Sequence, residues 1–167
     1  MSSRSKARKR AIDILYESDA RGIGARATLA ERVELADPPV NEFTSGLIDG
    51  VAENLAQIDA VLGEYAEGWT VARMPGVDRA ILRLGVYELL WRAEQVPAAV
   101  AIDEAVELAK TLSTDESPRF VNGVLARVLR EVPAMSPDAA TTFTAGDLSS
   151  ADPDPADTAG DDPGPAR

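Results

Sequence analysis

The stretch from residue 98 to residue 132 constrains the fold more than any other part of this 167-residue chain, because it predicts two amphipathic helices in close succession. Apolar residues in its first half recur at helical spacing along one face: Ile102, Ala105, Val106, Ala109 and Leu112. The second half has a similar stripe: Val121, Val124, Leu125, Val128, Leu129 and Val132. Residues 113–116 break the pattern, and Ser117-Pro118 restarts it with a serine N-cap and a proline at the first helical position. Two such stripes predict a helical hairpin.

Gly123 lies inside the second of these helices, where a glycine costs about 1 kcal/mol relative to alanine. One interpretation is that another helix crosses closely at this position, and we favour it. The alternative is that the segment 120–123 borders a functional surface.

The first 97 residues contain further helical patterns, which we place at residues 4–20, 27–36 and 77–90, with one helix or two over 42–66. Gly22 is expected to end the first helix and Asn41 to cap the start of 42–66. In that segment Gly46 and Gly50 lie one turn apart, where they would let a neighbouring helix approach. The helix 77–90 is apolar almost all round and should be the most buried. Its two arginines are expected to pair with acids such as Glu88 or Asp78: Arg79 and Arg83.

Composition excludes several classes of function. The chain has no cysteine and no histidine, so it lacks disulfides, thiolate metal sites and histidine-based catalysis. It also lacks a phosphate-binding glycine loop, an apolar run of about 18 residues and the apolar core of a signal peptide. We therefore expect a cytoplasmic protein that is neither an enzyme nor a membrane protein, with no metal and no cofactor.

Charge is distributed unevenly along the chain, which has a formal net charge of −11. Residues 1–10 are basic and contain no acid, whereas residues 138–167 contain seven aspartates and a single arginine. Such asymmetry suggests an interaction tail or contact with nucleic acid. Residues 134–167 are rich in proline, alanine and aspartate, and we expect them to be a disordered acidic tail after a helical domain at 1–133.

Three segments carry a resemblance to a known family. They are Ala7-Arg8, Ala11 and Leu15-Tyr16 in the first helix; residues 77–90, with a VxxAxLRxxxYEL-like pattern; and AIDEAVELAK followed by FVNGVL in residues 101–125. Over roughly residues 4–132 the chain resembles the NusB family of transcription antitermination factors. The resemblance implies an all-α bundle of about seven helices in two three-helix subdomains. It also implies binding to boxA RNA together with the ribosomal protein NusE, assembly with other Nus factors and RNA polymerase, and a role in ribosomal RNA transcription.

The resemblance also assigns roles to individual residues. Phosphate contacts fall to Arg4, Lys6, Arg8 and Lys9, although a basic N-terminus in a generic protein is more often a solvated helix end. Phe120 would stack on an unpaired base, with an ordinary core phenylalanine as the alternative, and Glu116 would tune RNA release by repulsion or would simply be solvated. Tyr16 and Asp78 match positions that face NusE, though Tyr16 could equally pack between helices. The competing hypothesis for function is an RNA-independent protein–protein adaptor, and in either case the free protein could form a homodimer.

Overall fold

The computed structural model describes residues 1–135, and within that range the chain forms seven α-helices, one short 3-10 helix and no strand. The α-helices are α1 (Ser3–Arg21), α2 (Ala25–Leu35), α3 (Glu42–Glu53), α4 (Leu55–Tyr65), α5 (Gly76–Trp91), α6 (Ala98–Leu112) and α7 (Ser117–Glu131). The 3-10 helix η1 (Val71–Arg73) lies between α4 and α5. The all-α class and the number of helices are confirmed.

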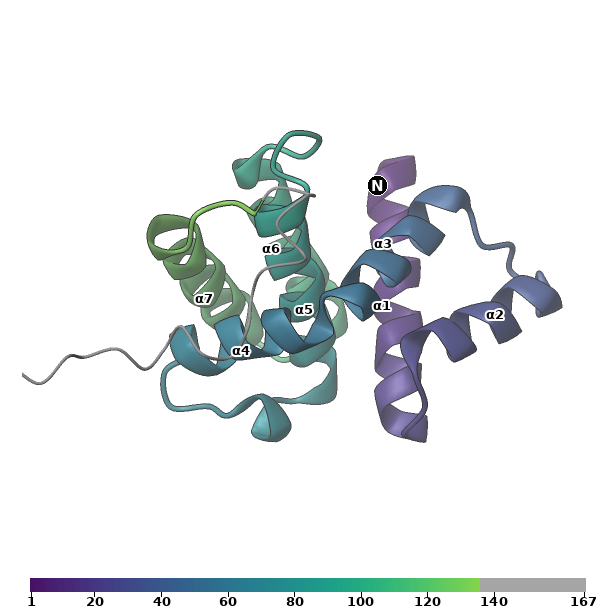
Figure 1. The fold of residues 1–167 in the computed structure, drawn as a ribbon, viewed down its shortest axis with the longest axis horizontal. Helices are drawn as coiled ribbons and strands as arrows, with labels where there is room; N and C mark the ends of the chain where they lie inside the picture. The colour runs from purple at the N-terminus through teal and green to yellow at the C-terminus, as the bar shows by residue number, and fades with distance from the viewer. Residues whose placement is uncertain (136–167) are drawn as a thin grey trace, which may run out of the picture.

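The helices form two groups that share α5 as a contact. Helices α1, α2 and α3 pack together on one side, and α4, α5, α6 and α7 pack together on the other (Figure 1). Helix α5 also packs against α1 and α3, so it joins the two groups. The second group thus has four helices rather than three, because residues 42–66 form two helices that belong to different groups.

The break between α3 and α4 falls at Asn54, whose buried side chain donates a hydrogen bond from Nδ2 to the carbonyl oxygen of Gly50, at 2.8 Å. This bond gives the amide a partner where the helix changes direction. The question that the sequence left open is answered in favour of two helices.

Helix α5 is the centre of the core, as predicted. All but two of the residues from Asp78 to Leu90 are buried, and Gly85 allows Leu125 of α7 to approach so closely that an added Cβ would lie 2.8 Å from its Cδ1 atom. Gly50 has the same relation to Tyr87, with an added Cβ only 2.0 Å from the ring. Gly46, in contrast, has no neighbour within 4 Å of that position, so the prediction of a close approach is right for Gly50 and wrong for Gly46.

Arginines on α5 tie the two groups together. Arg79 pairs with Asp19 of α1 at 2.8 Å, and Arg83 pairs with both Asp19 and Asp59 of α4, at 2.9 and 2.8 Å. The expected pairing with Glu88 or Asp78 is therefore wrong. On a helix these two acids point away from the arginines, which turn outward to α1 and α4.

Both predicted helix ends are confirmed. Gly22 closes α1 in the left-handed conformation, with φ of 66°, and Asn41 Oδ1 accepts a hydrogen bond from the backbone N–H of Thr44. At the other end of the chain, the N–H of Met135 donates to the carbonyl oxygen of Leu90 at 2.7 Å. The predicted disordered tail lies, from residue 136 onward, outside the described residues. No helix within residues 1–135 is long and apolar enough to span a membrane.

Candidate nucleic-acid interface

The first turns of α1 carry the predicted cationic residues, but these do not share one environment. Ser2 caps the helix, since its Oγ accepts a hydrogen bond from the N–H of Ser5. Arg4 and Lys6 are exposed, whereas Lys9 is partly buried and pairs with Asp13 at 3.2 Å. Two cations are thus open to a ligand, and the third is shared with an acid one turn along the helix.

Arg8 departs from its predicted role. Its side chain is buried, with the residue 2% exposed, and its Nε lies 3.0 Å from both carboxylate oxygens of Glu88, which is itself 1% exposed. A further nitrogen of the guanidinium lies 2.9 Å from Glu88. Because this ion pair is enclosed between α1 and α5, Arg8 is not available to a phosphate. The prediction of a phosphate contact is corrected to a structural role.

A phenylalanine that the sequence did not single out lies at the same end of α1. The guanidinium carbons of Arg4, Arg8 and Arg92 lie 5.4, 5.6 and 5.6 Å from the ring centroid of Phe43. Arg92 directly follows α5, and Phe43 is near the start of α3. No local pattern predicts this cluster, because its members come from α1, from α3 and from the residue after α5, which are far apart in the chain.

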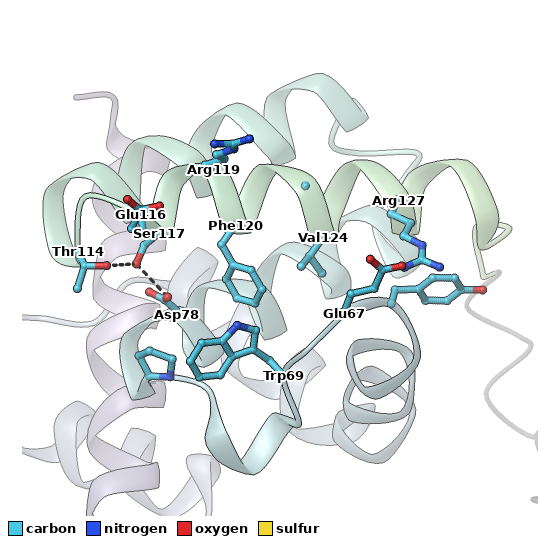
Figure 2. Close-up of a pocket in the computed structure, with 13 residues that line it drawn as sticks. Glu67, Trp69, Asp78, Thr114, Glu116, Ser117, Arg119, Phe120, Val124 and Arg127 are labelled. Atoms are coloured by element: carbon cyan, nitrogen blue, oxygen red, sulfur yellow. Dashed lines mark hydrogen bonds and ion pairs between the residues drawn. The ribbon is translucent and has the colours of Figure 1, made fainter.

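A groove of about 680 Å³ lies on the other group of helices, along α7 (Figure 2). Phe120 is partly buried and points into it toward Trp69, which is 46% exposed in the loop after α4. Their ring centroids are 6.3 Å apart and the rings are tilted by 58°. This arrangement leaves aromatic surface open to a flat ligand. The sequence analysis did not identify Trp69 as a candidate, and only its exposed position beside Phe120 in the structure indicates a role.

The rim of this groove is mixed in charge. Glu116 and Arg119 are exposed at one end, where both line the groove together with Phe120. At the other end Arg127 pairs with Glu67 at 2.6 Å and lies over the ring of Tyr65. Desolvation alone would lower the pKa of Arg127, but Glu67 and Glu131 outweigh it and raise that pKa. The guanidinium therefore stays charged at the groove.

Gly123 lines the groove, and no atom lies within 4 Å of the position that a Cβ would take. The favoured interpretation, a closely crossing helix, is therefore wrong at this residue. Phe120 and Gly123 line the groove, whereas Val121 is buried in the core, and the alternative of a functional surface at residues 120–123 stays a prediction.

Asp78 lines the base of the groove but is only 4% exposed. Its carboxylate accepts hydrogen bonds from the hydroxyl of Ser113 at 2.5 Å and from that of Ser117 at 2.9 Å. Figure 2 shows the bond to Ser117. Ser117 thus begins α7 by bonding to α5, and it does not cap the helix as predicted. These two bonds give Asp78 a role in holding the start of α7, and its expected contact with NusE stays a prediction.

Tyr16 of α1 is 46% exposed, and one edge of its ring packs against Gly76 at the start of α5. An added Cβ on Gly76 would lie 2.9 Å from that ring. The open face of Tyr16 is accessible to a partner, and its predicted role stays a prediction. Within residues 1–135, no group of three or more acidic side chains is arranged to hold a metal ion.

Comparisons with known proteins agree with this architecture. The sequence model of the NusB family matches residues 5–130. The transcription antitermination protein NusB of Saccharopolyspora erythraea is 65% identical over 129 residues, which are 77% of this chain and 87% of that protein. The NusB protein of Thermobifida fusca is 54% identical over 134 residues, or 80% of this chain and 94% of the relative.

Two solved structures extend the comparison to the fold. NusB from T. maritima superposes with a TM-score of 0.68 and 33% identity, covering 78% of this chain and 93% of its own. A crystal structure of antitermination factors NusB and NusE in complex with dsRNA matches with a TM-score of 0.66 and 28% identity, covering 76% and 96%. The chain therefore belongs to the NusB family of transcription antitermination proteins.

Proposed function

We propose that this protein is a transcription antitermination factor that binds boxA RNA together with NusE and supports ribosomal RNA transcription. The observation that carries the proposal is the match to a solved NusB in complex with NusE and RNA, over most of both chains. Membership of the family supports the antitermination role and the absence of catalysis.

In this proposal the RNA uses two parts of the surface. Arg4 and Lys6 neutralise phosphates at the exposed start of α1, with a smaller contribution from Lys9 because Asp13 competes for its ammonium group. Phe120 and Trp69 provide stacking faces for unpaired bases in the groove. Glu116 lies at the rim, where its charge opposes a nearby phosphate and favours release of the RNA.

NusE is the proposed protein partner, and Tyr16 is the residue that we assign to its interface. The exposed aromatic face on α1 supports this assignment. We further propose cytoplasmic assembly with other Nus factors and RNA polymerase, and a homodimer as the resting form of the free protein.

A binding titration tests the proposal. A labelled twelve-nucleotide RNA carrying a ribosomal leader boxA, and a scrambled RNA of the same composition, are each titrated with the full chain, with and without purified NusE. We expect tighter binding of boxA than of the scramble, and a further gain when NusE is present. Affinity should fall steeply as salt rises, because phosphate contacts release counterions.

The alternative, an RNA-independent adaptor, predicts a different result in the same titration. It requires NusE to bind the chain while both RNAs fail to bind at any salt concentration. That result would reject the RNA-binding function and return the basic start of α1 to the status of a solvated helix end.

A further inference from the structure

The arginines around Phe43 lie at the end of α5 that is opposite to the groove. Asp78 and Pro75, at the start of α5, line the groove, whereas Arg92 follows its last residue, Trp91. The N-terminus of α1 lies at the top of the molecule in Figure 1, and Arg4 brings that end of α1 to the same phenyl ring as Arg92. A positively charged site thus exists about one helix length away from the aromatic groove.

Compensation of charge within this cluster is incomplete. Arg8 is satisfied by Glu88, and Glu104 accepts a hydrogen bond from Ser5 and lies 4.0 Å from Arg8. Within residues 1–135, neither Arg4 nor Arg92 forms an ion pair, and the Nε of Arg92 is buried without any hydrogen-bond partner. A buried donor without a partner is unfavourable, so the partly buried side chain of Arg92 would gain by meeting an acceptor.

The ring of Phe43 explains how three like charges stay close together. A guanidinium within about 6 Å of an aromatic centroid is attracted to the negative face of the ring. The ring therefore holds Arg4 and Arg92 in place without neutralising them, as a carboxylate would. Planar guanidinium groups with free N–H donors bind phosphate in two-pronged geometry.

We propose that Arg92 and Arg4, oriented by Phe43, form a binding site for backbone phosphates of RNA, separate from the groove at Phe120. This inference rests on the proposed RNA-binding function and adds Arg92 and Phe43 to the residues that carry it. Helix α5 is about 24 Å long at 1.5 Å per residue. An RNA strand that reaches both sites therefore has to span about this distance.

The test compares Arg92→Ala with the wild type on the twelve-nucleotide boxA RNA, in the presence of NusE. We expect a several-fold loss of affinity and a decrease of about 0.7 in the slope of log affinity against log salt, since one phosphate contact is lost from a single strand. Arg92→Gln, which keeps the side-chain stem, should show the same loss. Phe43→Leu should weaken binding less, because the arginines remain but are no longer held by the ring.

Arg26→Ala is the matched control. It removes one positive charge from α2, where Arg26 is exposed and lies 3.4 Å from Asp49, and it should bind like the wild type. Wild-type affinity and salt dependence in a folded Arg92→Ala or Arg92→Gln protein would overturn the phosphate site. Failure of the wild type itself to bind boxA would overturn the proposed function instead, so the two failures are distinguishable.

Discussion

Arg4 and Arg8 are one turn apart on α1, yet their surroundings give them different roles. Arg4 is exposed, while Arg8 is enclosed with Glu88. Spacing along a helix shows that two residues share a face, but it does not show whether that face is covered by another helix. Arg8 is buried because it pairs with Glu88 of α5, and a pair 80 positions apart in the sequence could not be predicted from the spacing in α1.

Arg8→Ala should therefore act on stability. It leaves Glu88 buried and unpaired, so we expect the free energy of unfolding to fall by about 3–5 kcal/mol. Arg4→Ala should change it by at most about 1 kcal/mol, because an exposed cation–π contact is worth no more. Urea denaturation followed by circular dichroism measures both, and equal midpoints for Arg8→Ala and wild type would contradict the assignment.

The effect on RNA binding should be the reverse, with a change for Arg4→Ala and none for Arg8→Ala. Arg4→Ala should reduce the salt dependence of binding by about one phosphate contact, whereas the folded fraction of Arg8→Ala should keep the wild-type slope.

Phe120→Leu tests stacking in the groove. Leucine fills much of the same partly buried space but has no aromatic face, so boxA affinity should fall by about 1–3 kcal/mol while the protein stays folded. Leu129→Ala is the control, since Leu129 is an exposed apolar residue of α7 outside the groove. A Phe120→Leu protein that binds boxA as the wild type does would make Phe120 a packing residue only.

At the scale of helices, α3 offers a matched pair of glycines. Gly50→Ala would place a methyl group 2.0 Å from the ring of Tyr87, so we expect a loss of about 1–3 kcal/mol or more from overpacking. Gly46→Ala adds a methyl group in open space and should stabilise the helix by up to about 1 kcal/mol. Thermal unfolding of both variants checks this, and a shift of equal sign would contradict the packing between α3 and α5.

Gly123→Ala extends this reasoning to α7. Open space at the added Cβ predicts a gain of up to about 1 kcal/mol in stability. The same methyl group would project into the groove along α7, so if the proposed RNA site is correct, boxA affinity should fall while the melting temperature rises. Unchanged affinity in the stabilised variant would show that residues 120–123 border the groove without contacting the RNA.

These elements also show what the sequence could predict. Periodicity, Gly22 and Asn41 located the helices and their ends, because those signals are local. Periodicity could not tell that Arg79 and Arg83 would reach Asp19 and Asp59, nor that Arg92 would meet Phe43, since such pairs depend on how helices pack. The family motifs identified Phe120 and Glu116 at the groove, but burial at Arg8 and Asp78 was visible only in three dimensions.

At the scale of the whole molecule, the two ends of the chain carry opposite charges. Residues 138–167 carry seven aspartates and one arginine, and so supply −6 of the total of −11. Met135, just before this segment, is bound to Leu90, two residues from Arg92 of the arginine cluster. The described part of the chain therefore ends close to the basic site, and we expect the acidic residues that follow in the sequence to compete there with weakly bound RNA.

Removing residues 138–167 should accordingly raise the affinity for scrambled RNA several-fold at low salt. The gain should shrink as the salt concentration rises, because the Debye length falls from about 10 Å at 0.1 M to about 3 Å at 1 M. A full-length variant with the seven aspartates changed to asparagine should behave like the truncated chain, since it keeps the length and removes the charge. Fluorescence anisotropy with scrambled and boxA RNA measures both effects. If truncation leaves the affinity for scrambled RNA unchanged at low salt, the acidic residues do not screen the basic site, and discrimination between RNAs must come from the groove and the arginine cluster alone.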